Sequence, residues 1–167
     1  MARFCGRRPF ALALISIALL AFQIVLLQLL ATSQWHHFAY FVISIALLGF
    51  GVAGTLLSLL RTWMQARQEL LLPLLLCLAA VALAWTPRLS HGLFGGFDSL
   101  LLFVDPGEML RLAAVAFLLM LPFVCGALAI GLIFTLETEK IGHYYFANML
   151  GSAIGSVLGL FGLAWLP

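Results

Sequence analysis

Long apolar stretches follow one another along the whole chain, separated by short polar breaks. They cover residues 10–31, 38–60, 70–85, 112–136 and 144–165. About 20 apolar residues in an α-helix cross a hydrocarbon core roughly 30 Å thick. Four stretches are long enough, and the third is slightly short, so its polar flanks are expected to reach the headgroups. Because the stretches are continuous rather than alternating, they predict helices: an all-α, polytopic transmembrane bundle of five spans, forming a single domain over residues 1–167.

The composition agrees with this interpretation. Hydrophobic residues make up 65% of the chain and charged residues 8%, against about 25% charged in a soluble domain. A soluble domain of this size has no way to hide so much apolar surface. The lipid bilayer is therefore the predicted surrounding, and without a basic stripe no nucleic-acid partner is expected.

The distribution of Lys and Arg predicts the orientation. Six of the eight fall in the N-terminal segment and in the breaks at 61–69 and 137–143, and the other two are Arg88 and Arg111. Positive charge in short loops marks the cytoplasmic side. The N-terminus is therefore predicted to be cytoplasmic, and the end of the fifth span to lie outside. Trp35, Trp63, Trp85 and Trp165 fall near predicted span ends, where aromatic belts occur.

The first stretch fits either a signal peptide or a retained signal anchor. Arg7 and Arg8 precede it, as basic residues do in both cases. Its length exceeds the roughly 7–15 apolar residues of a signal peptide, and no clear cleavage site follows. The retained anchor is the favoured interpretation.

Two features of the fourth span are visible in the sequence. Asp105 precedes Pro106 and Gly107 at the end of the long outer break, and is predicted to cap the helix. Within that break, residues 100–104 are apolar but too short to span, so they are expected to lie in the membrane interface or to re-enter the membrane in part. Pro122 near the middle of the span fits a packing kink or a functional hinge, with packing favoured.

A stripe of glycines in the fifth span predicts close helix packing. Gly151, Gly155 and Gly159 recur every four residues, which lets another backbone approach. The second span has a similar patch, made of Gly49, Gly51, Ala53 and Gly54. We expect these two spans to pack against each other or against partner helices, including those of a second copy.

Polar residues inside the spans are the candidate ligand-lining residues. They are Gln23 and Gln28 in the first span and Asn148 and Ser152 in the fifth. They fit a polar lining for a ligand, because polar groups in lipid tend to face the bundle interior. They also fit hydrogen bonds between helices, worth about 0.6 kcal/mol each, and the second interpretation is favoured.

Recognisable catalytic and metal-binding patterns are not found. The cysteines, Cys5, Cys77 and Cys125, form no paired motif. On the predicted outer side, the spacing of the histidines and carboxylates matches no zinc site; these residues are His36, His37, His91, Asp98, Asp105 and Glu108. Neither a glycine-rich nucleotide loop nor a hydrolase triad is present. No catalytic residue, metal or cofactor is therefore expected.

Two stretches nevertheless resemble a known family. One comprises WHHFAY at 35–40 and SIALLGFGVAG at 44–54, and the other LPF at 121–123 and IGHYYFANMLGSAIG at 141–155. They are similar to the membrane region of bacterial spermidine-synthase-like proteins, in which transmembrane helices precede a soluble aminopropyltransferase or methyltransferase domain. The resemblance implies a multi-pass protein of the bacterial inner membrane with a link to polyamine chemistry.

The sequence departs from that family in its polar residues and its length. The family usually has an acidic residue where Gln23 or Gln28 stands and Asp where Asn148 stands. The chain stops at Pro167, so no transferase domain is expected on it. Three hypotheses follow: a non-catalytic anchor or interaction module, a transporter or ligand-binding module, and the membrane part of a transferase whose catalytic domain is separate.

Overall fold

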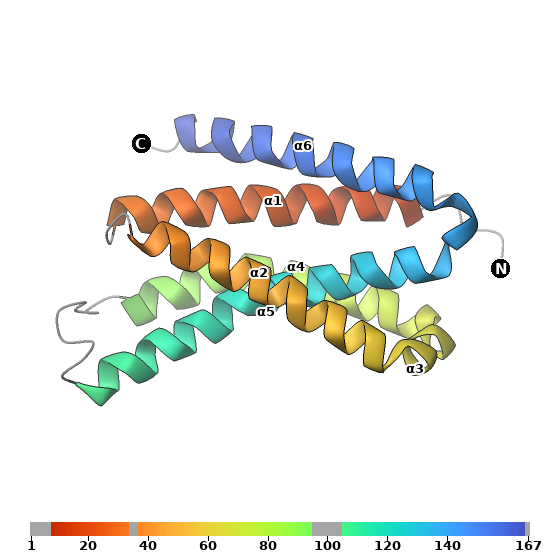
Figure 1. The fold of residues 1–167 in the computed structure, drawn as a ribbon. Helices are drawn as coiled ribbons and strands as arrows, with labels where there is room; N and C mark the ends of the chain where they lie inside the picture. The colour runs from red at the N-terminus through yellow and green to blue at the C-terminus, as the bar shows by residue number, and fades with distance from the viewer. Residues whose placement is uncertain (1–7, 34–36, 95–104, 166–167) are drawn as a thin grey trace.

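The protein is a bundle of α-helices. The computed structural model describes residues 8–33, 37–94 and 105–165, and none of these forms a strand. The elements are α1 (Arg8–Ser33), α2 (His37–Leu59), α3 (Arg61–Ala66), α4 (Gln68–Phe94), α5 (Pro106–Leu136), the short 3-10 helix η1 (Thr138–Lys140) and α6 (Ile141–Trp165) (Figure 1). Five of them, α1, α2, α4, α5 and α6, are long and apolar enough to cross a membrane. The predicted all-α, five-span bundle is confirmed.

The third span, α4, is longer than the apolar stretch at 70–85 predicted. The helix continues through Thr86, Pro87 and Arg88 to Phe94. Hydropathy falls at these three residues, but Thr86 is buried, and Arg88 donates to the carbonyl of Ala84 at 3.1 Å. A proline inside a membrane helix removes one hydrogen bond without ending the helix when its neighbours compensate. The expectation of a short third span was therefore wrong.

The fourth span, α5, starts earlier than the stretch at 112–136 indicated. Its first residue is Pro106, and Asp105 caps it by accepting a hydrogen bond from the Gly107 N–H at 2.8 Å. The predicted cap is confirmed. The apolar pattern placed the start too late because the first turn of the helix is polar, whereas a capping side chain and a proline at the first position determine where the backbone turns.

The break at 61–69 is not a plain loop but contains α3. Met64 is the buried residue of this short helix. It packs beside Leu75 of α4 and Ala129 and Leu132 of α5. Six residues are too short a window to show a helical period, so the sequence interpretation missed α3.

α5 lies in the middle of the bundle, between α2 and α4. Its buried Phe123 belongs to a cluster to which α1, α2 and α4 contribute Ile15, Leu19, Ala46 and Ala79. Gly49 of α2 sits so close to α5 that an added Cβ would lie 2.8 Å from the Cβ of Phe123. Pro122, also buried, lies beside this crossing. The centre of the bundle is thus filled with apolar side chains.

The N-terminal end of α1, the α3 region and the turn around η1 lie together at one end of the bundle, while the C-terminal ends of α1 and α4 and the first turns of α2 and α5 lie at the other (Figure 1). Arg8, Arg61, Arg67 and Lys140 are all in the elements and junctions of the first end. Successive spans run in opposite directions, so the start of the first span, the junction of the second and third and the junction of the fourth and fifth must lie at the same end. Which end faces the cytoplasm stays a prediction from the charge bias.

α4 and α6 lie at the outside of the bundle and expose large apolar side chains. Examples are Leu74, Leu78 and Val81 on α4, and Phe146, Leu158 and Phe161 on α6. Surfaces of this kind are stable in hydrocarbon rather than in water. The chain is therefore a multi-pass membrane protein whose outer surface contacts lipid.

Candidate functional site

The glycine stripe of α6 faces α1, and the two helices run parallel (Figure 1). A Cβ added at Gly151 would lie 2.6 Å from the carbonyl oxygen of Ala13, and one at Gly155 would overlap the carbonyl of Ile17. At Gly159 the nearest atoms belong to Ala21 and Ile24, all at 3.2 Å. Only glycine permits backbones to approach this closely. The stripe is therefore a contact surface within the chain.

Of the two alternatives expected for the second and fifth spans, packing against each other was wrong, and packing against a partner outside the chain stays a prediction. α6 packs mainly on α1, and α2 packs mainly on α5. Of the small patch in α2, Gly49 meets α5, whereas added Cβ atoms at Gly51 and Gly54 would meet nothing within 4 Å. Small residues show that a surface permits close packing, but they do not identify the partner, because every neighbouring helix is equally apolar.

A polar contact lies beside the stripe. The Ser16 hydroxyl of α1 is 2.7 Å from the Asn148 Oδ1 of α6 and 2.8 Å from the carbonyl oxygen of Leu12. A serine has one hydroxyl proton, so it donates to one of these acceptors at a time. Ser16 is fully buried. The sequence analysis missed it because a single serine in an apolar span resembles any small residue.

The four candidate ligand-lining residues do not come together. Asn148 engages Ser16, and Ser152, one turn further along α6, accepts at its carbonyl from the Ser156 hydroxyl at 2.7 Å. Gln23 and Gln28 lie 7 and 12 residues beyond Ser16 on α1, which is roughly 10 and 18 Å along the helix axis. Gln28 is exposed at the surface of the bundle. The pattern is a set of separate polar contacts rather than a shared lining.

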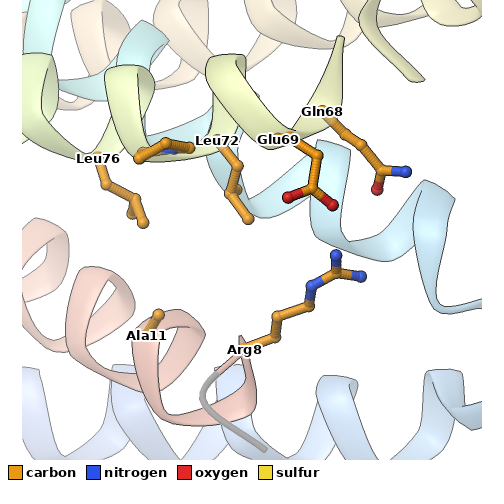
Figure 2. Close-up of a pocket in the computed structure, with 7 residues that line it drawn as sticks. Arg8, Ala11, Gln68, Glu69, Leu72 and Leu76 are labelled. Atoms are coloured by element: carbon orange, nitrogen blue, oxygen red, sulfur yellow. The ribbon is translucent and has the colours of Figure 1, made fainter. Parts of the chain in front are cut away.

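A cavity of about 230 Å³ lies between the beginnings of α1 and α4 (Figure 2). Its polar lining residues are Arg8, Gln68 and Glu69, and its apolar ones are Ala11, Leu72, Pro73 and Leu76. Glu69 and Pro73 are exposed, so the cavity opens to the surroundings. The cavity exists because α1 packs mainly against α6 and α4 mainly against α5. Direct contacts between α1 and α4 are therefore few.

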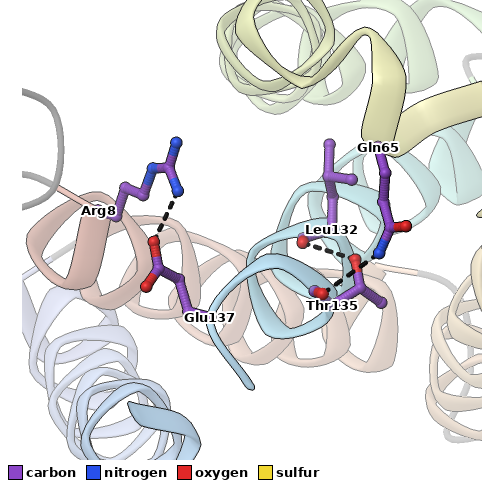
Figure 3. A network of polar contacts seen from close by, with 5 residues as sticks. All are labelled: Arg8, Gln65, Leu132, Thr135 and Glu137. Atoms are coloured by element: carbon purple, nitrogen blue, oxygen red, sulfur yellow. Dashed lines mark hydrogen bonds and ion pairs between the residues drawn. The ribbon is translucent and has the colours of Figure 1, made fainter. Parts of the chain in front are cut away.

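An ion pair joins the start of α1 to the end of α5 at the same end of the bundle as the cavity (Figure 3). Arg8 Nη1 of α1 lies 2.6 Å from Glu137 Oε1, at the C-terminal end of α5, and both side chains are largely buried. Nearby, Gln65 Nε2 of α3 donates to the carbonyl of Thr135 at 3.3 Å. The last carbonyls of a helix have no partner within the helix. These contacts fasten α1 and α3 to the end of α5.

Two residues that line the cavity carry an acceptor without a partner among the residues that the structure describes. Gln68 Oε1 is buried and forms no hydrogen bond. The carboxylate of Glu69 forms no ion pair with any described residue; the described pairs are Arg8–Glu137 and Arg111–Glu108. Pro73 also supplies no N–H to the carbonyl of Glu69, four residues before it.

A second buried carboxylate lies at the opposite end of the bundle. Glu108, in the first turn of α5, is 7% exposed. Its Oε1 accepts from Arg111 at 2.9 Å, and its Oε2 has no partner among the described residues. The sequence analysis placed Glu108 only among the residues of the predicted outer side, because nothing in the pattern indicates that this side chain of the first turn of α5 faces inward.

The histidines and carboxylates of the predicted outer side, whose spacing matched no zinc site, are described only in part. His36 and Asp98 lie outside the described residues, as do Cys5, Trp35 and the segment 100–104. Within the described part of the chain, no three His, Cys, Asp or Glu side chains gather to hold a metal ion. Cys77 and Cys125 are free thiols. On α6, His143 is exposed and meets the Tyr144 ring edge-on, with centroids 6.2 Å apart.

Comparison with known proteins gives no match, whether to protein-family models, to curated proteins or to solved structures.

Proposed function

We propose that the chain is a non-catalytic membrane module of the bacterial inner membrane, which anchors or pairs with other helices. The packed centre of the bundle is the observation that carries this proposal. Phe123 is 1% exposed, and it packs against Leu19, Ala46 and Ala79 from three other helices. A side chain packed in this way blocks passage along the bundle axis.

Transport through the bundle would need a different interior. Transporter sites lie near the bilayer midplane and use polar residues or interrupted helices. Among the described residues, the buried polar side chains are Ser16, Thr86 and Glu108. They come from three helices, and Ser16 and Glu108 lie toward opposite ends. They line no common path, which favours an anchor over a transporter.

The resemblance to spermidine-synthase-like proteins supports the same proposal from another side. In that family the transmembrane helices accompany a soluble transferase domain. The stretch at 141–155 that carries the resemblance contains Asn148, Gly151 and Gly155, the residues that fasten α6 to α1. The resemblance thus concerns residues that build the bundle. A separate transferase chain is accordingly the partner that we propose.

Reconstituted vesicles test this proposal. The full chain should resist extraction by alkaline carbonate, and vesicles containing it should take up putrescine and spermidine no faster than protein-free vesicles. Saturable, competable uptake of either amine would overturn the anchor proposal. Aminopropyl transfer to putrescine by the purified chain alone would overturn it in another way, since the catalytic centre would then lie in the membrane helices.

A further inference from the structure

We propose that the chain self-associates in the membrane through one flank of α6, so that the partner on this surface is a second copy of the chain. The polar flank is defined by Asn148, Ser152 and Ser156, which follow one another every four residues along α6. All three side chains are half-buried beside the contact with α1. The anchoring role proposed above does not use this surface, and the inference does not depend on that role.

The first argument is the difference between the two flanks of α6. The helix lies at the outside of the bundle and packs mainly on α1 (Figure 1), so both flanks border the membrane. One flank carries large apolar side chains that are well exposed, which are Leu150, Ile154, Leu158 and Phe161. The polar flank, on roughly the opposite side of the helix, carries an amide and two hydroxyls. Because polar groups within a bilayer normally face protein rather than lipid, the polar flank is the side on which a protein partner is expected.

The second argument is the unused hydrogen-bonding capacity of Asn148. Among the described residues, Ser16 is the hydrogen-bond partner of this side chain, at 2.7 Å from Oδ1. A side-chain amide has two N–H donors and an oxygen with two lone pairs, so one contact leaves donors and a lone pair over. The Nδ2 atom is accessible at the surface of the bundle. Asn148 lies roughly 15 Å along the helix from Thr138, where the apolar span begins, and at that depth water does not supply the missing partner.

The third argument is that this amide is its own complement. Copies inserted in the same orientation form a closed dimer about a two-fold axis, which must run along the membrane normal. Residues of the same flank then meet their counterparts at the same depth. Each Asn148 amide can donate an N–H to the Oδ1 of the other, because an amide is both donor and acceptor. A single asparagine in the seam of a coiled coil specifies its register and oligomeric state in a comparable way.

The fourth argument is the small size of the neighbouring side chains. Small residues four apart are typical of transmembrane helices that approach closely, and Ser152 and Ser156 continue the flank at this spacing. The Ser156 hydroxyl donates to the carbonyl of Ser152 at 2.7 Å, so it needs no further partner and does not hinder the approach. A helix of another protein would need its own amide or carboxylate at the depth of Asn148, whereas a second copy always supplies one.

Cysteine cross-linking locates the contact. The full chain, with Cys5, Cys77 and Cys125 replaced by alanine, would carry Ser152→Cys or Ile154→Cys, and membranes would be oxidised with copper phenanthroline. Ser152→Cys should give a disulfide-linked dimer, since a disulfide needs Cα atoms within about 7 Å. Ile154→Cys, on the apolar flank, should give little. Equal cross-linking at both positions, or none at Ser152→Cys, would overturn the proposal.

The affinity between copies tests the role of the amide. Donor- and acceptor-labelled chains would be mixed in phosphatidylcholine vesicles, and energy transfer measured as the ratio of chain to lipid is lowered. Asn148→Leu deletes both reciprocal hydrogen bonds and should raise the dissociation constant about tenfold or more, as expected for two bonds between membrane helices. Ser16→Ala is the matched control, because it removes the contact within the chain and keeps the amide. If Ser16→Ala weakens the dimer as much as Asn148→Leu, the amide acts only through α1 and the proposal is refuted.

Added bulk gives a second test of the same surface. Ser152→Phe places a ring between the two helices and should abolish energy transfer. Ala153→Phe makes a similar change at an exposed neighbour, turned about 100° away around the helix, and should leave most of the transfer. If Asn148→Leu fails to fold, this pair still decides, and equal loss in both variants contradicts the assigned surface. A chain that stays monomeric at every ratio would show that lipid or another protein covers the flank, and self-association would be rejected.

Discussion

Replacing Gly155 by alanine perturbs the α1–α6 contact with a single methyl group. An added Cβ would lie 2.8 Å from the Cα of Ile17, whereas ordinary contact begins at 3.4 Å, and the Ile17 carbonyl oxygen is nearer still. Both are backbone atoms, so a rotamer change cannot relieve the overlap. α6 must move away from α1 by at least the difference, 0.6 Å.

This displacement weakens the whole contact rather than one position. A gap of about 0.5–1 Å forfeits roughly a quarter to a half of the dispersion energy between the atoms involved. Overpacking typically costs about 1–3 kcal/mol, and the better helix propensity of alanine returns up to about 1 kcal/mol. We expect Gly155→Ala to lower the free energy of unfolding by about 1–2 kcal/mol, and Gly155→Leu by more.

Thermal unfolding in detergent measures the effect. A loss of this size corresponds to a fall in Tm of about 2–8 °C for a chain of this length. Gly162→Ala is the matched control, because an added Cβ there meets nothing within 4 Å, so its Tm should stay the same or rise slightly. If Gly155→Ala and Gly162→Ala give the same Tm, the close approach of α6 to α1 does not contribute to stability and the reasoning is refuted.

Three further predictions concern polar groups and topology. A double-mutant cycle of Ser16→Ala and Asn148→Ala should give a coupling of about 0.6 kcal/mol, and strict additivity would contradict their contact. Glu137→Gln should lower the free energy of unfolding by about 1–2 kcal/mol, between the values for exposed and buried ion pairs, and this loss should largely vanish in an Arg8→Gln background. Alkaline phosphatase fused after Pro167 should be active and a fluorescent protein there dark; the reverse result would invert the predicted orientation.

The spans could be predicted from the sequence because lipid imposes a simple rule on it. A backbone in hydrocarbon must form its own hydrogen bonds, so apolar length alone indicates a helix. The boundaries were less accurate where other forces act. α4 continues past its apolar stretch through the buried Thr86, and the Asp105 cap starts α5 within a polar segment. Caps were predictable from residue type, but burial of a threonine was not.

The arrangement of the helices could not be predicted. The glycine stripe at 151–159 indicated close packing. Whether α6 packs on α1 or on α2, however, depends on the fit of Gly155 against Ile17, and the sequence of one helix alone does not determine the fit between two helices. The cavity has the same origin, because its residues Arg8 and Gln68 start two helices that are far apart in sequence. As isolated residues they resembled ordinary flanking charges and amides of a membrane span.

The parallel pairing of α1 with α6 also has a consequence for biosynthesis. Ser16 and Asn148 are separated by 132 residues, and ribosomes add about 5–20 residues per second. α1 therefore waits roughly 7 to 26 s in the bilayer before its partner is made. During this interval lipid must cover the face that α6 will occupy. That face has ordinary apolar positions at Ala13, Ile17 and Ala21, and the glycines are on the helix that arrives later. The surface of α1 is thus compatible with lipid before α6 is made. The glycines of α6 then allow this helix to approach α1 closely and to displace the lipid.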